Sequence, residues 1–201
     1  MTGYKIVNLK LMLEEAGEDI AKQVLSTFSC PLNKDVEKFL KVKAIEFAKQ
    51  GLSQTHLIFT SYKQEVVLVG YFTLASKYIT VSGKNLSSTL RKRISKFSIF
   101  DPRIKAYCLS APLIAQLGKN YTNNYHTLIS GGELLALACN KVAQIQLDLG
   151  GKFAYLECED KPALVNFYRK NGFCEFDKRI LDSDETELEG GYLVQLLRYI
   201  K

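Results

Sequence analysis

The chain has 201 residues and a formal net charge of +6, with 47% hydrophobic and 24% charged residues. This composition is typical of folded proteins and excludes disordered and collagen-like chains, and the length fits a single domain over residues 1–201. No apolar run is long enough to cross a bilayer and the N-terminus lacks the apolar core of a secretion signal, so we expect a cytoplasmic protein without membrane contact.

The first part of the chain is expected to form a short strand, two helices and a pair of strands. The strand is expected near 4–10 and the helices near 17–29 and 33–49, the second helix beginning at Asn33 and ending at Gly51. Two β-like runs follow, THLIFT and VVLVGYFTLASKYITV. The turn-like SYKQE between them predicts an antiparallel hairpin.

Basic residues are concentrated in residues 84–105, where seven basic residues and one acidic residue give a local net charge of +6. Apolar residues recur there at helical spacing and predict an amphipathic helix: Leu86, Leu90, Ile94 and Phe97. Its outer face would carry Arg91, Lys92, Arg93 and Lys96. Such a face attracts nucleic acid, an acidic partner or an anionic cofactor. A solvated face is the simpler interpretation, and we favour it over nucleic-acid binding.

The second part of the chain alternates strands and helices. A long strand, AYCLSAPLIAQL, is followed by a polar loop and a helix near 131–149. The remaining expected elements are a strand FAYLEC, a helix near 161–171 capped by Asp160 and ended by Gly172, and strands GFCEF and GYLVQLLRYI. Hairpins followed by a β-α-β-α-β run predict a mixed sheet in an α/β or α+β protein.

The five cysteines are widely spread and include no C-x-x-C pair: Cys30, Cys108, Cys139, Cys158 and Cys174. An odd number at such spacing argues against a disulfide framework and against a zinc cage. We therefore expect reduced, mostly buried thiols and no metal site. His56 and His126, the two histidines, are too isolated to indicate a catalytic triad.

The loop from Lys119 to Ser130 and the helix after it carry the clearest chemical signal. Ser130 and Glu133 fit a capping box, so Gly131 and Gly132 would begin the helix with no side chains over their N–H groups. Bare amides at the positive end of a helix dipole suit a phosphate or pyrophosphate. Glu133 already complements that dipole and repels phosphate. An anion site and a plain structural cap are therefore both open.

Residues Ala106–Phe176 resemble the GNAT (Gcn5-related N-acetyltransferase) superfamily. The stretches LIAQLGK, SGGELLALACNKV and LECEDKPALVNFYRKNGF are similar to its central strand, its pyrophosphate helix and its strand-helix-strand near the thiol, and NFYRKNGF is the most specific piece. The pyrophosphate loop of the family reads Q/R-x-x-G-x-G/A. With Gly131 at its last position, this chain departs from it at His126 and Ile129.

The resemblance implies a mixed, mostly antiparallel sheet flanked by helices, with acetyl-CoA as co-substrate and no metal. The implied cofactor contacts are Gln116, Leu117, Gly118 and Lys119 along the pantetheine arm, Ser130, Gly131 and Gly132 at the pyrophosphate, and Asn166 as a secondary contact. Tyr168 matches the tyrosine that protonates the departing thiolate. A tyrosine on the apolar side of a helix is otherwise most simply a core residue.

The resemblance also implies direct attack by an acceptor amine, without a covalent enzyme intermediate. Glu157 and Glu159 alternate onto one face of their strand, and Glu157 is the candidate for the general base. The alternative is that both carboxylates are paired with Lys or Arg. Cys158 lacks a histidine partner and is interpreted as a core residue rather than a nucleophile.

Three functions remain open at this point. The first is an N-acetyltransferase that acts on a primary amine of a small molecule or protein. The second is a toxin-like acetyltransferase of aminoacyl-tRNA that uses the basic helix for RNA contact. The third is a degenerate GNAT-fold interaction module without catalysis. The last strand could also pair across a homodimer interface.

Overall fold

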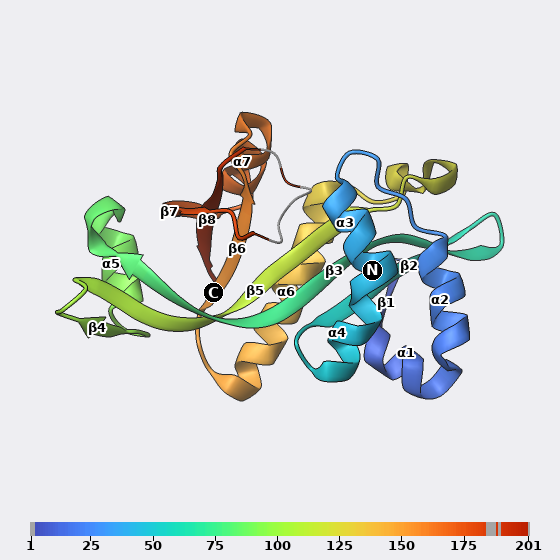
Figure 1. Cartoon of the computed structure of the whole chain (residues 1–201), viewed down its shortest axis with the longest axis horizontal. Helices are drawn as coiled ribbons and strands as arrows, with labels where there is room; N and C mark the ends of the chain where they lie inside the picture. The colour runs from blue at the N-terminus through green and yellow to red at the C-terminus, as the bar shows by residue number, and fades with distance from the viewer. Residues whose placement is uncertain (1–2, 184–187, 189, 201) are drawn as a thin grey trace. The chain divides into compact units, whose positions relative to one another are not determined.

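The computed structural model describes residues 3–183, 188 and 190–200, and contains an eight-stranded mixed sheet (Figure 1). The strands are β1 (Tyr4–Asn8), β2 (Gln54–Tyr62), β3 (Glu65–Ser82), β4 (Ile99–Asp101), β5 (Ala106–Lys119), β6 (Phe153–Glu159), β7 (Cys174–Ile180) and β8 (Tyr192–Tyr199). Their order is β1-β2-β3-β5-β6-β8-β7, with β4 paired to β5. Only β5 and β6 pair in parallel among the described registers, so the expected mixed, mostly antiparallel sheet is confirmed.

The α-helices are α1 (Leu9–Ala16), α2 (Glu18–Ser26), α3 (Lys34–Lys38), α4 (Ala44–Gln50), α5 (Ser88–Ile94), α6 (Gly131–Leu149) and α7 (Pro162–Lys170). A π-helical turn, η1 (Phe39–Lys43), separates α3 from α4, and short 3₁₀ turns occur at η2 (Gly83–Asn85) and η3 (Thr122–Thr127). No helix in the described part of the chain is long and apolar enough to cross a membrane.

The chain divides into two compact units. Unit 1 comprises Met1–Ala75 and Ala115–Ala138, and unit 2 comprises Ser76–Ile114 and Cys139–Lys201. The division passes through three continuous elements, β3, β5 and α6. The expectation of one domain over residues 1–201 stays a prediction.

The core of unit 1 is formed by α1–α4 together with β2 and the first part of β3. Its buried side chains include Leu9, Leu25, Phe28, Leu40, Leu57 and Tyr71. The ring of Phe28 meets that of Tyr71 edge-on at 5.1 Å, and the Tyr71 hydroxyl donates to the Val36 carbonyl at 2.6 Å. A buried tyrosine thus supplies apolar area and has its hydroxyl satisfied.

The expected helices of unit 1 are corrected in three places. The strand expected over 4–10 ends at Asn8, whose Oδ1 accepts from the N–H groups of Lys10 and Leu11 and begins α1, a helix that the sequence analysis did not find. The helix expected at 17–29 begins at Glu18, and the one expected at 33–49 contains the π turn. The Asn33 cap and the left-handed Gly51 are confirmed.

The core of unit 2 forms where α5 packs with β6, β7 and β8. Leu86, Leu90 and Ile94 are buried there as the spacing predicts, whereas Phe97 is 42% exposed. The four expected cations of the helix face are exposed: Arg91, Lys92, Arg93 and Lys96. The amphipathic helix is therefore confirmed, although it is shorter than its sequence pattern.

The boundaries of α6 and α7 agree with the expected helices, but the cap of α7 does not. Lys161, not Asp160, occupies the N-cap of α7, and it makes no side-chain cap. Asp160 instead pairs with Lys178 on β7. Gly172 follows α7 with a φ of 83°, as expected for a left-handed terminator. All five cysteines are free, and Cys30, Cys139 and Cys158 are buried.

Candidate functional site

The end of β5 in unit 1 carries the residues expected along the pantetheine arm, and its side chains already have partners. Gln116 Nε2 donates to Asp35 Oδ2 at 2.9 Å, which ties the strand to α3. Lys119 Nζ donates to the carbonyl of His126 at 3.1 Å, which ties the strand to the loop that follows. These residues therefore position neighbouring segments, and any contact with a cofactor would use the main chain, as expected.

Gly118 is a glycine for a packing reason. A Cβ built on it would lie 2.4 Å from Val36 Cγ1. Its carbonyl oxygen lies 2.8 Å from the position that a Cβ on Gly70 would occupy. Both glycines allow close approach between β3, β5 and α3, which a methyl group would prevent. Gly118 was expected to contact a cofactor, and its close packing adds this steric requirement.

Asn120 anchors the loop after β5 and was missed by the sequence analysis. Its Oδ1 accepts from the N–H groups of Ser29 and Thr122 at 2.9 and 3.1 Å. Its Nδ2 donates to the carbonyls of Leu68 and Thr27 at 2.8 and 3.3 Å. Asn120 is fully buried, so these four bonds satisfy a costly polar group. One asparagine in a polar loop gives no sequence signal for this role.

The two positions that depart from the family's pyrophosphate pattern have structural roles. His126 stacks on Tyr121, with ring centroids 4.3 Å apart and an interplanar angle of 15°. Ile129 is 1% exposed. These side chains fix the loop that leads into α6.

The start of α6 is a complete capping box. Ser130 Oγ accepts from the Glu133 N–H at 3.1 Å, and the Ser130 N–H donates to Glu133 Oε2 at 2.8 Å. The hydrogen bond from the Ser130 backbone lowers the pKa of Glu133, so its carboxylate is ionised at neutral pH. One of the three amides expected at the pyrophosphate, that of Ser130, is therefore already bonded to a carboxylate.

The amides of Gly131 and Gly132 remain available. Within the described residues, no protein group accepts a hydrogen bond from either N–H. They lie at the positive end of a 19-residue helix. Two bare amides and the helix dipole fit a pyrophosphate, while the Glu133 carboxylate beside them opposes it. The residues therefore fit the diphosphate of acetyl-CoA, with one unfavourable charge.

Tyr168 in unit 2 lies in an aromatic cluster on α7. Its ring centroid is 5.1 Å from that of Phe167 and 5.9 Å from that of Phe173. Burial, together with the nearby Cys158 thiol, raises the pKa of Tyr168 well above its ordinary value. No described residue hydrogen-bonds its hydroxyl. Tyr168 is therefore a protonated phenol with its donor unused, whereas Asn166, on the same helix, is exposed to solvent.

Cys158 faces α7 but is not activated as a nucleophile. The thiol is buried, and burial together with the carboxylates of Glu175, Asp160 and Glu159 raises its pKa to about 12. The thiolate is the reactive form of cysteine. Cys158 is therefore an inert core thiol at neutral pH, in agreement with its interpretation as a core residue.

Glu157 is ion-paired, which is the alternative that the sequence left open. Its Oε2 accepts from Nε and Nη2 of Arg179 at 2.8 and 2.7 Å. The Glu157 side chain is 10% exposed and that of Arg179 is 23% exposed. Burial raises the pKa of Glu157, but hydrogen bonds from Arg179 and Tyr155 outweigh it and keep the pKa below its ordinary value. A carboxylate held in this way is a poor proton acceptor.

Two further residues complete the network around Glu157. The fully buried Tyr155 donates its hydroxyl hydrogen to Glu157 Oε1 and accepts from Gln195 Nε2 at 2.6 Å. Gln195 lies opposite Glu157 in the β6–β8 register. Tyr155 could have been found from the period-2 alternation of β6, because it shares the face of Glu157. Arg179 and Gln195 could not have been found from the sequence, because the order β6-β8-β7 in the sheet does not follow the order of the strands along the chain.

Comparison with solved structures shows the fold of the chain. No family model matches the sequence, and no curated protein matches it. The structure titled "AtaT complexed with acetyl-methionyl-tRNAfMet" matches at a TM-score of 0.62 and 17% identity, over 95% of this chain and 93% of that chain. A tyrosine-to-phenylalanine variant of KacT matches at a TM-score of 0.61 and 15% identity, over 96% and 94%. The chain has the GNAT fold.

The expected elements are present in the expected order, with β5 followed by the long helix α6 and β6 followed by α7. The resemblance had placed these elements on LIAQLGK, SGGELLALACNKV and LECEDKPALVNFYRKNGF. At sequence identities below 20%, the structural similarity shows the fold alone, and the roles of single residues stay predictions.

Proposed function

We propose that this GNAT-fold chain transfers an acetyl group from acetyl-CoA to a primary amine. The observation that carries the proposal is Tyr168, a buried phenol with no hydrogen-bond partner among the described residues and a raised pKa. The bare amides of Gly131 and Gly132 would hold the diphosphate, with main-chain groups of Leu117, Gly118 and Lys119 along the pantetheine arm. Acetyl-CoA supplies the acyl thioester.

In this proposal Tyr168 is the proton donor. Burial keeps its phenol protonated at neutral pH, so the O–H can donate to sulfur as negative charge develops there. The acceptor amine attacks the carbonyl directly, and Cys158 takes no covalent part because its thiol stays protonated. Asn166 is exposed beside Tyr168 on α7 and remains a secondary cofactor contact in the proposal.

The proton of the acceptor amine leaves to solvent water in this scheme. Arg179 and Tyr155 hold Glu157 ionised with a lowered pKa, which weakens it as a base. A role for Glu157 as general base would require its ion pair with Arg179 to open. With the pair intact, Glu157 contributes a fixed negative charge on the face of β6.

The experiment is an acceptor panel with the full chain. Purified protein is mixed with radiolabelled acetyl-CoA and with polyamines, lysine peptides or charged tRNA, and both label transfer and release of the CoA thiol are recorded. We expect both signals with at least one amine. Absence of transfer, together with no calorimetric heat from acetyl-CoA well above micromolar concentration, would favour the interaction module instead.

A second acceptor class, aminoacyl-tRNA, is favoured by one comparison. The AtaT structure is titled as a complex with acetyl-methionyl-tRNAfMet. In this chain, α5 and the turn after it expose the cations that such an acceptor would need: Arg91, Lys92, Arg93 and Lys96. Phosphate contacts by basic side chains make affinity fall steeply as salt rises.

Salt titration tests the tRNA acceptor. We expect charged-tRNA binding to weaken at least tenfold between about 50 and 200 mM salt, and to weaken further when these four cations are changed together to glutamine. Binding that is unaffected by salt and by the fourfold change would exclude this acceptor. A cytoplasmic location and a homodimer also remain proposals.

A further inference from the structure

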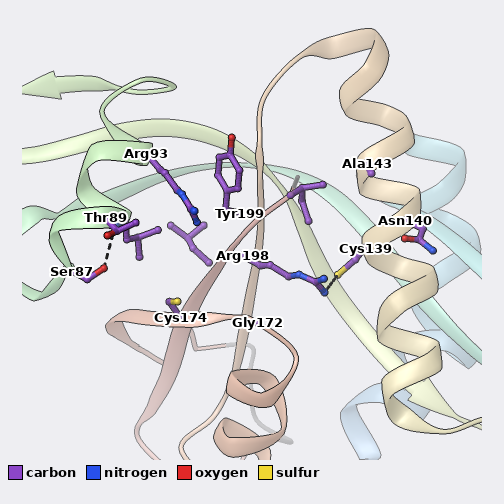
Figure 2. A pocket seen from close by; sticks show the side chains of 13 residues that line it. Ser87, Thr89, Arg93, Cys139, Asn140, Ala143, Gly172, Cys174, Arg198 and Tyr199 are labelled. Carbon is purple, nitrogen blue, oxygen red and sulfur yellow. Dashed lines mark hydrogen bonds between the residues drawn. The ribbon is translucent and has the colours of Figure 1, made fainter.

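Unit 2 contains a pocket of about 560 Å³ that is formed by α5, the part of α6 from Cys139 onward, and the paired strands β7 and β8 (Figure 2). The volume is within the range of about 300–1,000 Å³ typical of small-molecule sites. Its polar lining consists of Ser87, Thr89, Arg93, Asn140 and Arg198. Among the described residues, no acidic side chain lines it. The pocket is therefore cationic and equipped with hydrogen-bond donors.

Neither arginine of the pocket is neutralised. In the described part of the chain, no carboxylate pairs with Arg93 or Arg198. Arg198 Nη1 donates to Cys139 Sγ at 3.4 Å, and Figure 2 shows this side chain reaching from β8 to α6. Burial raises the pKa of Cys139, so its partner is a neutral thiol, a weak acceptor. Two positive charges thus face the same pocket without a counter-ion among the described residues.

The guanidinium groups are also oriented for an anion. Arg93 lies over the ring of Tyr199, with 4.7 Å from its Cζ to the ring centroid. Arg198 lies over the ring of Phe173 at 5.9 Å. A guanidinium held over an aromatic ring can still donate from its N–H groups to phosphate oxygens, and of these groups only Nη1 of Arg198 has a described partner, the weak acceptor Cys139 Sγ. Holding both groups in place reduces the entropy lost when a ligand binds.

Two hydroxyl groups add hydrogen-bond donors to the lining of the pocket. Ser87 Oγ accepts from the Leu90 N–H at 3.2 Å, so its own hydrogen stays available. Thr89 and Asn140 add a second hydroxyl and an amide, and Leu90, Ala143 and Leu197 add apolar lining. The positive charge of the two arginines together with the hydroxyl donors suits a phosphate group. The side-chain amide of Asn140 and the apolar residues suit the sugar and base of a nucleotide.

We propose that this pocket binds the phosphate group of a nucleotide, with Arg93 and Arg198 as the phosphate ligands. The nucleotide is either free in solution or the terminal nucleotide of an RNA strand, because both present the same chemistry. The pocket shares no residue with the acetyl-CoA contacts proposed above, and the proposal does not depend on acetyl transfer.

The test uses the full chain with saturating CoA, which prevents a nucleotide probe from reporting the cofactor site. Calorimetry follows AMP, adenosine, and a short single-stranded RNA with and without a 5′-phosphate. We expect AMP or the 5′-phosphorylated RNA to bind at least tenfold more tightly than its counterpart lacking that phosphate. Preference for AMP identifies a free nucleotide, and preference for the RNA identifies a strand end.

Substitutions separate the pocket from general charge. Arg93→Gln and Arg198→Gln should each weaken binding of the phosphorylated probe about tenfold or more, whereas Lys77→Gln, at an exposed lysine of β3 outside the pocket, should change the affinity less than twofold. If Arg198→Gln does not fold, Arg198→Lys replaces it as the test variant. It keeps the positive charge and should still weaken binding, because lysine lacks the planar guanidinium that binds two phosphate oxygens at once. Equal weakening by Lys77→Gln, or no preference for the phosphate, would overturn the proposal.

Discussion

Arg179 determines the charge and orientation of Glu157 in unit 2. Its two N–H groups bind a single carboxylate oxygen, while Tyr155 occupies the other oxygen. The pair is largely shielded from water, so removal of one partner leaves a poorly solvated charge. The network is therefore expected to contribute to stability as well as to fix Glu157 on β6.

Arg179→Gln should destabilise the protein by about 1–3 kcal/mol, because charge-assisted hydrogen bonds are lost and Glu157 stays partly buried. Urea unfolding at neutral pH measures the change. The control is Arg103→Gln, which breaks an exposed ion pair with Asp101 and should change stability by less than about 0.5 kcal/mol. Equal stability of wild type and Arg179→Gln would contradict the structural account of this network.

The same pair predicts a pH dependence. Since the folded pKa of Glu157 is lowered, its stabilising effect is present above the unfolded pKa of about 4.3 and is lost as pH falls through the folded value. Wild type should therefore lose stability on acidification, and Arg179→Gln should lose less over the same range. If the free energy of unfolding fell equally with pH in the two proteins, the ion pair would not lower the pKa of Glu157.

At the residue scale, candidate side chains could be predicted from the sequence better than their hydrogen-bond partners. Tyr168 was found because NFYRKNGF is specific, and Ser130 with Glu133 because the capping box is local. The pairing of Glu157 with Arg179 crosses 22 positions of sequence and depends on strand order. Long-range hydrogen bonds of this kind leave no periodic pattern to read.

At the scale of elements, the start of α6 combines a cap with a proposed anion site. Glu133→Gln keeps the capping geometry, because glutamine also serves in a capping box, and removes the negative charge beside the amides of Gly131 and Gly132. We expect acetyl-CoA to bind several-fold more tightly with little change in melting temperature. Calorimetry measures the affinity, and unchanged or weaker binding would place the diphosphate elsewhere.

The contact of α3 with β5 depends on Gly118. Gly118→Ala would bring a methyl group to 2.4 Å from Val36 Cγ1, and valine is stiff at χ1, so we expect a loss of about 1–3 kcal/mol in urea unfolding. Gly191→Ala, which meets nothing within 4 Å, is the control. The double variant with Val36→Ala should recover part of the loss, and no recovery would contradict this packing.

Element boundaries were predictable where caps are local. Ser130 and Gly150 bound α6, and Gly51 ends α4, each at the expected place. The helix α1 was missed because Asn8 ends β1 and caps the helix at once, so no loop separates the two patterns. The π turn between α3 and α4 arises from packing and has no distinct periodicity.

For the whole molecule, the order of strands and helices along the chain predicted the fold class, while function depends on a few side chains. The mixed sheet followed from hairpins and a later β-α-β-α-β run, and the GNAT fold is confirmed by matches that cover nearly all of both chains. The pocket in unit 2 was not foreseen, because Arg93 and Arg198 are brought together by tertiary packing. One fold hosts many acceptors, so activity has to be argued from the site.

The most direct measurement compares wild type with Tyr168→Phe for release of the CoA thiol and for acetyl-CoA affinity. We predict that kcat falls about 100-fold or more, since proton donation is lost, while the Kd changes less than twofold. Tyr192→Phe, an exposed tyrosine on β8, should behave as wild type. Wild-type turnover in Tyr168→Phe would contradict the proposal that Tyr168 is the proton donor.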